Sequence, residues 1–506
     1  MGETSSAVSA GRGVSYLWLQ IIVSSVARIV AFAFFARLIS VSEMGIFAIL
    51  NLASGGASAL IGLGFSSVVT KFVAENIAQG KKVEAASVYY KSLLLSELAS
   101  ILVAAGFLLS KFPAGVSNLP NSPLISTISI LFVIDLIIVN FGQTAATVFY
   151  GLLEFRNYAL IYTIYTSVRP FMVVLFVYEA GSLVGLVEAW VISDTVLAVY
   201  VFLYLWRRLG PPVFRFGTKY LLKLSTPLYL AGLASFLYGS FDQLTLIPLV
   251  SLSALGVYGA TVTAFTAYIM LVNVFGSVLL PVFSGIHGAK GLEVLEDSIR
   301  TASRYVSLVA MPLAFALLAT ARPALTLLVG GAYQSGVIPL AVLALGSIAS
   351  IIALSLSPVL IVLNETVLAA LTSILTIPLG VAVEFVLIPV LGILGASIAR
   401  ALSMLLSLLL TLYFVRRKIT VKLDFQAILK SVLASGGMAL AMEAFQLVYY
   451  SRFLLPVYLA VGFLVYLLGM RALKAVGTVD IDLLRHTLGP RFRGVCDLLS
   501  RVVIPQ

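Results

Sequence analysis

The sequence predicts an all-α polytopic membrane protein with about fourteen transmembrane helices, arranged as two six-helix bundles related by pseudo-two-fold symmetry plus two C-terminal helices. Its composition, its long apolar runs and a short stretch that occurs twice support this prediction. The chain has 506 residues and is 61% hydrophobic but only 10% charged, whereas soluble proteins typically have about 25% charged residues. Such a chain cannot cover a water-facing surface, so it must lie in a membrane.

The apolar runs are long enough for helices, because a helix needs about 20 apolar residues to span the bilayer, whereas a barrel strand needs only about 9–11. The six runs of the first bundle are 14–39, 45–69, 91–109, 125–149, 158–177 and 183–206. The runs of the second bundle are 220–249, 255–282, 305–321, 339–361, 366–389 and 393–414, and two more follow at 427–448 and 453–472.

The distribution of lysine and arginine predicts the orientation, because cytoplasmic loops carry an excess of these residues. With the N-terminus inside, most of the 32 lysines and arginines fall in the inner segments, and the outer segments contain only Lys111, Arg322 and Arg452. Both termini are therefore expected in the cytoplasm of a multi-pass cell-membrane protein. The net charge of +11 then reflects topology and requires no nucleic-acid partner.

Two pairs of similar stretches recur at nearly one offset. "SVSEMGIFA" (40–48) and "SLSALGVYG" (251–259) are 211 residues apart, and each lies between two apolar runs. "VGLVEA" (184–189) and "LGASIA" (394–399) open the sixth and twelfth runs, each with glycine in second place. Together they indicate a duplicated six-span unit, and parallel repeats of this kind are an architecture of transporters that rock about a central site.

The duplication and the basic linker "RRLGPPVFRFGTK" set the expected domain boundaries. We expect an N-terminal half at 1–210, a C-terminal half at 211–418, two additional helices within 419–473 and a cytoplasmic tail at 474–506.

Three stretches resemble a known family. "FFARLISVSEMGIFAIL", "LGFSSVVTKFVAENIAQGKKVEA" and "PVLGILGASIARAL" resemble segments of polysaccharide and oligosaccharide-lipid flippases of the multidrug/oligosaccharidyl-lipid/polysaccharide exporter superfamily. The plan of six plus six plus two spans also resembles this family. The resemblance implies alternating-access export of a lipid-linked oligosaccharide or polysaccharide precursor from the inner to the outer leaflet.

Charged residues inside the spans are the candidate substrate-binding or lumen-lining residues, because a charge in lipid is costly unless it faces a cavity or a partner. Arg28 lies near the middle of the first span and is a candidate for contacting substrate phosphate. Asp242 lies near the repeat image of Arg28, so the two could meet across the halves, or Asp242 could bind a coupling proton or cation. A structural role for Arg28 is an equally open alternative.

Four further charges complete the candidate set. Asp135 and Arg169 lie at similar depth on neighbouring antiparallel spans, where a purely structural ion pair is the main alternative to a site. Asp194 lies in the sixth span and Arg400 in the twelfth, which occupies the same place in the second repeat. Their signs balance, which favours a mixed rather than a strongly cationic lumen.

Other functions have weaker support. The single cysteine, Cys496, excludes an intramolecular disulfide, and two distant histidines indicate no metal cluster, so no metal or cofactor is expected. No ATP-binding glycine-rich loop occurs, which favours coupling to a proton, a cation or the substrate gradient. A cation- or proton-coupled multidrug antiporter is the alternative function. A membrane-embedded glycosyltransferase is less favoured, because the longest outer loop contains no acid, and we expect no enzymatic activity.

Overall fold

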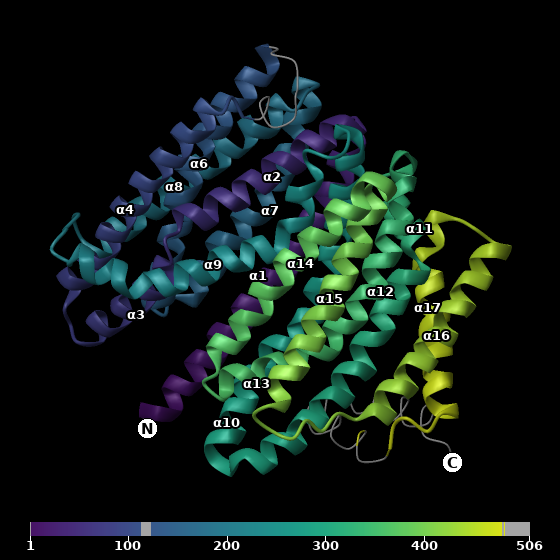
Figure 1. The fold of residues 1–506 in the computed structure, drawn as a ribbon. Helices are drawn as coiled ribbons and strands as arrows, with labels where there is room; N and C mark the ends of the chain where they lie inside the picture. The colour runs from purple at the N-terminus through teal and green to yellow at the C-terminus, as the bar shows by residue number, and fades with distance from the viewer. Residues whose placement is uncertain (1, 113–122, 478–479, 481–506) are drawn as a thin grey trace. The chain divides into compact units, whose positions relative to one another are not determined.

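The computed structural model describes residues 2–112, 123–477 and 480, and it confirms the predicted fold class (Figure 1). The described elements are all helical, with no strand among them, and thirteen are long and apolar enough to cross a membrane. The predicted outer loop around Ser117 and most of the predicted tail lie outside the described residues.

The helix α10 explains why thirteen elements are consistent with about fourteen predicted spans. It runs from Leu252 to Ala319, and its 68 residues are interrupted by non-helical backbone only at Gly291, where φ is 82°. At 1.5 Å per residue its 68 residues amount to about 100 Å of helix in two parts that meet at the kink at Gly291, far more than the ~30 Å of one hydrocarbon core. It therefore contains both the eighth and the ninth predicted spans.

The chain divides into two compact units, and the division lies between Gly259 and Ala260. The predicted domain boundaries after residues 210, 418 and 473 stay predictions. Helix α9 lies in the first unit, where it packs against the second and third helices.

The first unit contains eight labelled helices and the beginning of α10. They are α1 (Gly2–Leu38), α2 (Val41–Ile61), α3 (Phe65–Ala78), α4 (Lys82–Leu109), α6 (Pro123–Gly151), α7 (Phe155–Ala180), α8 (Val184–Leu209) and α9 (Thr218–Leu246). Helices α4, α6 and α8 lie side by side (Figure 1), and α7 packs against α1 and α8. The core of this unit is formed by large side chains of α3, α4, α6 and α8, including Tyr89, Phe149 and Val201.

The second unit contains the rest of α10 and the remaining elements. They are α11 (Ala321–Leu328), η1 (Gly331–Gly336), α12 (Val337–Leu354), α13 (Ser357–Val362), α14 (Thr366–Leu391), α15 (Ile393–Arg416), α16 (Phe425–Val448), η2 (Arg452–Leu454) and α17 (Leu455–Ala472). Helix α15 packs between α12 and α14, while α16 and α17 pack against each other as a pair.

The predicted second span, 45–69, is broken in the structure. Helix α2 ends at Ile61, and Leu63 and Gly64 both have left-handed backbone, with φ of 45° and 69°. A Cβ atom on Gly64 would lie 2.5 Å from the carbonyl oxygen of Ser225 in α9. Glycine is needed here because it tolerates this conformation and allows α9 to pass close to the bend.

The two units repeat the same local geometry at an offset of 211 residues. Leu153 and Asn364 both have left-handed backbone directly before the N-cap of a long helix, and that N-cap is a glutamate in each unit. Gly181 and Gly392, which end these helices, also have φ near 60°. Equal turns at equal spacing are what a duplicated sequence should produce.

The glutamate N-caps also make equivalent ion pairs. In the first unit Glu154 accepts from Arg208 Nε at 2.8 Å. In the second unit Glu365 pairs with Lys418, which is displaced from Arg208 by 210 residues. Each pair links the start of one long helix to the end of the next one. Arg208 lies in the last turn of α8, and Lys418 lies just after the end of α15.

The glycines of the second sequence echo have one shared steric role. A Cβ atom on Gly185 would lie 2.2 Å from the Phe176 carbonyl oxygen, and one on Gly395 would lie 2.4 Å from that of Leu387. Both glycines therefore allow the start of one helix to lie directly against the end of the preceding helix. No other residue fits without moving backbone.

The first sequence echo shows why one chain contains the same turn twice. Within the first unit the two copies touch each other: Ser42 Oγ lies 2.7 Å from Ser253 Oγ. A Cβ atom on Gly45 would lie 2.1 Å from the Leu252 carbonyl oxygen, and one on Gly256 would lie 2.1 Å from that of Val41. Each position contacts the repeat image of its partner, which is the pattern of an isologous contact.

Candidate intramembrane charge cluster

Three of the six predicted charged residues come together in the first unit. Asp135 on α6, Arg169 on α7 and Asp194 on α8 meet where these helices pack. Arg169 Nη2 lies 2.9 Å from Asp194 Oδ2 and 3.9 Å from Asp135 Oδ2. Both carboxylates are fully buried, whereas 26% of the Arg169 side chain is exposed. We call these three residues the charge cluster.

Asp194 has a hydrogen-bond donor on each oxygen. The Tyr165 hydroxyl donates to Oδ1, and Arg169 Nη2 donates to Oδ2. The guanidinium carbon of Arg169 also lies 5.0 Å from the centre of the Trp190 ring. Charge-assisted hydrogen bonds are stronger than neutral ones, and a cation–π contact adds to the attraction, so Arg169 links α7 to α8 at this point.

Asp135 has a different environment from Asp194. Neither of its carboxylate oxygens accepts a hydrogen bond from a described residue, and Arg169 Nε has no acceptor among the same residues. If all three groups were ionised, the charge cluster would carry one net negative charge inside an apolar bundle. Burying a carboxylate without donors is costly, so the two aspartates are chemically unequal.

Arg28 and Asp242 are not paired with each other. Among the described residues, the exposed Arg28 donates within its own helix, from Nε to the Ser24 carbonyl at 3.3 Å and from Nη2 to Ser25 Oγ at 3.4 Å. The buried Asp242 accepts from the Tyr258 hydroxyl at 2.7 Å and from the Gln243 backbone N–H at 3.0 Å. Their predicted role in lining a cavity stays a prediction.

Arg400 lies in the second unit, on α15, and is half-buried. Its predicted role in substrate binding also stays a prediction. The sequence grouped it with the first-unit charges by repeat position, and in the structure it belongs to the other compact unit.

Sequence reasoning did not include Tyr165 and Trp190, although both contact the charge cluster. A usable signal was present, because Tyr165 precedes Arg169 by four residues and Trp190 precedes Asp194 by four residues. Residues four apart lie on the same face of a helix. An aromatic residue one turn before an intramembrane charge is therefore a reasonable candidate for a partner of that charge.

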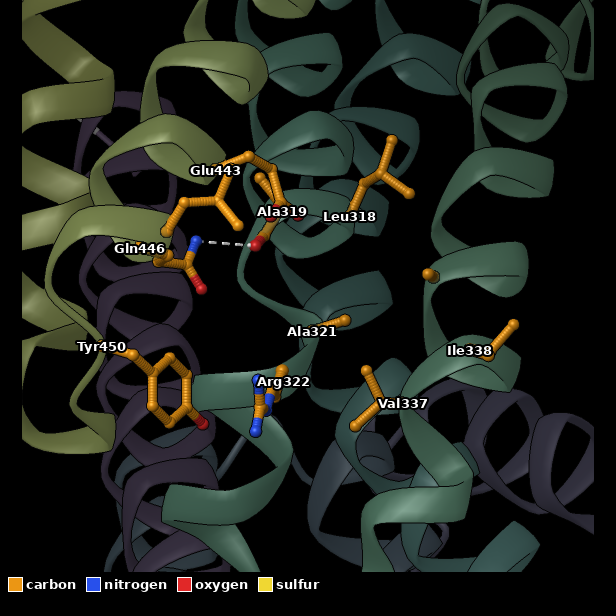
Figure 2. Close-up of a pocket in the computed structure, with 11 residues that line it drawn as sticks. Leu318, Ala319, Ala321, Arg322, Val337, Ile338, Glu443, Gln446 and Tyr450 are labelled. Carbon is orange, nitrogen blue, oxygen red and sulfur yellow. Dashed lines mark hydrogen bonds between the residues drawn. The ribbon is translucent and has the colours of Figure 1, made fainter.

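The second unit has a pocket of about 210 Å³ between the end of α10, α11, α12 and α16 (Figure 2). Its polar side chains are Arg322, Glu443, Gln446 and Tyr450. The Arg322 guanidinium carbon lies 4.3 Å from the Tyr450 ring centre. Gln446 Nε2 donates to the Ala319 carbonyl at 2.9 Å, which satisfies backbone where α10 ends (Figure 2).

In the described part of the chain, the His, Cys, Asp and Glu residues form no group of three or more that could hold a metal ion. In the charge cluster, the guanidinium of Arg169 occupies the position between the two carboxylates that a cation would need.

The fold is similar to those of solved transporters of the multidrug/oligosaccharidyl-lipid/polysaccharide superfamily. A structure of the lipid II flippase MurJ in an inward closed conformation matches with a TM-score of 0.66 and 14% identity, and the match covers 94% of this chain and 99% of that one. An inward-facing multidrug resistance transporter of the MATE family matches with a TM-score of 0.65 and 15% identity, over 80% of this chain and 98% of that one.

A third structure is a transporter of the same superfamily from Pyrococcus furiosus, matched with a TM-score of 0.55 and 16% identity over 80% of this chain and 92% of that one. No curated protein matches this sequence. The family model described as "Polysaccharide biosynthesis protein" matches residues 34–338. Since that match spans more than half of the sequence, the chain belongs to this polysaccharide biosynthesis protein family.

Proposed function

We propose that the protein is a flippase that moves a lipid-linked oligosaccharide or polysaccharide precursor from the inner to the outer leaflet of the cell membrane. Its membership of the polysaccharide biosynthesis protein family carries this proposal. The helices α16 and α17 add support. They follow the two predicted six-span halves and so match the plan of six plus six plus two spans that resembles the flippases. The match to the lipid II flippase covers 94% of the chain, compared with 80% for the MATE transporter.

The proposed mechanism is alternating access without a covalent step, so the protein is not an enzyme. The two halves would rock about a central site, with both termini in the cytoplasm as the positive-inside rule predicts. Arg28 is the proposed contact for the substrate phosphate. Its side chain is exposed and donates, among the described residues, to Ser24 and Ser25 of its own helix. A guanidinium can bind phosphate oxygens in a bidentate way.

Coupled export of a drug-like cation is the alternative function. The fold similarity to MATE transporters and the buried acids of the charge cluster favour it. The two functions differ in substrate: the flippase requires a polyprenyl-type lipid bearing a phosphate-linked glycan, whereas the antiporter requires a soluble or amphipathic cation.

The test uses purified protein in liposomes with a fluorescent polyprenyl-diphosphate oligosaccharide. Movement between leaflets is measured as the fraction of glycan that an impermeant lectin can reach. Arg28→Ala should reduce the rate about 10-fold or more, because a hydrogen bond to a charged group is worth about 1.5–3 kcal/mol. Arg28→Lys should retain part of the rate. The matched control Arg452→Ala removes an exposed arginine of η2 and should have no effect.

Two results would contradict the proposal. One is a wild-type protein that leaves the glycolipid in place but moves a lipophilic cation down an ion gradient, which would establish the antiporter. The other is an Arg28→Ala variant with wild-type flipping, which would remove Arg28 from the substrate path.

A further inference from the structure

The unequal environments of Asp135 and Asp194 indicate a specific use for the charge cluster. We propose that Asp135 is a proton-binding site, that Asp194 remains the ionised partner of Arg169, and that the proton on Asp135 is the coupling ion of transport. This inference rests on the proposed transport function and names its coupling ion.

The hydrogen-bond donors decide which aspartate carries the proton. Both oxygens of Asp194 accept, one from Tyr165 and one from Arg169 at 2.9 Å. Neither oxygen of Asp135 accepts a hydrogen bond from a described residue, and its distance to Arg169 Nη2 is 3.9 Å. When two buried carboxylates compete for one cation, the one with fewer donors takes the proton.

The charged groups on the neighbouring helices do not replace Arg169 as a partner. On α4, Glu97 accepts from Asn140 Nδ2 at 2.9 Å and adds a further acid. On α3, Lys71 pairs with Glu75 at 3.7 Å on an exposed surface. On α2, Glu43 belongs to the capping box at the helix start. The ion pairs of the two aspartates with described residues are those with Arg169.

The proton step is a simple transfer. A hydronium ion gives its proton to the Asp135 carboxylate and leaves as water, so the net charge of the cluster changes from minus one to zero. About 26% of the Arg169 side chain is exposed, whereas both carboxylates are buried. Loss of the proton recreates a second carboxylate that competes with Asp194 for the same guanidinium.

This competition couples the proton to helix packing. An ionised Asp135 on α6 attracts Arg169 of α7 away from Asp194 of α8, and so weakens the link between α7 and α8. Trp190 lies 5.0 Å from the Arg169 guanidinium, so its surroundings change in the same step. The protein therefore contains its own fluorescent reporter of the proton.

The test is a fluorescence titration of purified protein without substrate. The chain has three tryptophans, and Trp18→Phe/Trp206→Phe leaves Trp190 alone. Its emission should show one transition between about pH 5 and 9. Asp135→Asn should abolish the transition, whereas Glu97→Gln, which removes a half-buried acid outside the cluster, should keep it. Transport by Asp135→Asn should lose its dependence on pH over the same interval.

A second variant keeps the test decisive if Asp135→Asn does not fold. In Asp194→Asn the guanidinium has only Asp135 as its partner, so Asp135 should stay ionised to lower pH and the transition should move down. The inference is overturned if Trp190 shows no transition, or if the transition is the same in both aspartate variants as in the parent. Because the titration requires no substrate, it can succeed even if the proposed glycolipid is not transported.

Discussion

The pair of Arg169 and Asp194 allows a quantitative test of the charge cluster. Arg169→Met removes the cation and leaves Asp194 with only the Tyr165 hydroxyl as a donor. Breaking a buried ion pair typically costs about 3–5 kcal/mol. Because 26% of the Arg169 side chain is exposed, the lower end of this range applies, or about 3 kcal/mol of unfolding free energy.

The second substitution should reverse most of that loss. In Arg169→Met/Asp194→Asn, position 194 no longer carries a carboxylate that would be left without a cation. The asparagine side-chain oxygen can still accept a hydrogen bond from Tyr165. We expect the double variant to lie within about 1 kcal/mol of the wild type, so that the coupling energy in the cycle is about 2 kcal/mol or more.

The assay is the melting temperature of the detergent-purified protein, followed by the loss of the monodisperse peak in size-exclusion chromatography. At about 2 °C per kcal/mol for a large chain, Arg169→Met should melt about 6 °C below the wild type. The matched control is Arg208→Met, which breaks an ion pair of the same unit in which 60% of the arginine side chain is exposed. It should change the melting temperature by about 2 °C or less, since exposed pairs contribute about 0–1 kcal/mol.

One outcome would refute this reasoning. If the losses of the two single variants simply add in the double variant, the guanidinium and the carboxylate are not coupled. The stability of the bundle would then depend on the packing of these side chains and not on their charges.

Three further predictions concern the topology and the repeat. A cysteine probe at Ser253 should react with an impermeant reagent from outside in a Cys496→Ser background, whereas one at Thr420 should not; reversed labelling would overturn the orientation. Gly395→Ala should lower the melting temperature, because overpacking costs about 1–3 kcal/mol, whereas Gly436→Ala, where a Cβ atom meets nothing within 4 Å, should leave it unchanged or raise it; equal effects would contradict the close approach. Glu365→Gln should lower the melting temperature by no more than about 2 °C, since it breaks a partly exposed pair, and a larger loss would show that the pair contributes more than its exposure indicates.

The sequence was sufficient to predict the membrane class, the helical fold, the approximate number of spans and the repeated unit. Each of these depends on a one-dimensional signal, such as the length of an apolar run or the spacing of a short stretch. The glycines at 185 and 395 are an example: the sequence echo located them, and the structure shows that both accept a helix backbone where a Cβ atom would clash.

The tertiary structure alone decided where the long runs break and which charges meet. The run 45–69 divides at Gly64 because α9, more than 150 residues further along the chain, passes beside it. Asp135, Arg169 and Asp194 meet because three helices are rotated so that their charged residues point at one another. Lipid and the bundle interior are both apolar, so a membrane helix carries little sequence pattern that indicates which face is buried. Depth in the membrane can therefore be predicted from the sequence, but the partners of a buried charge depend on helix rotation, which only packing fixes.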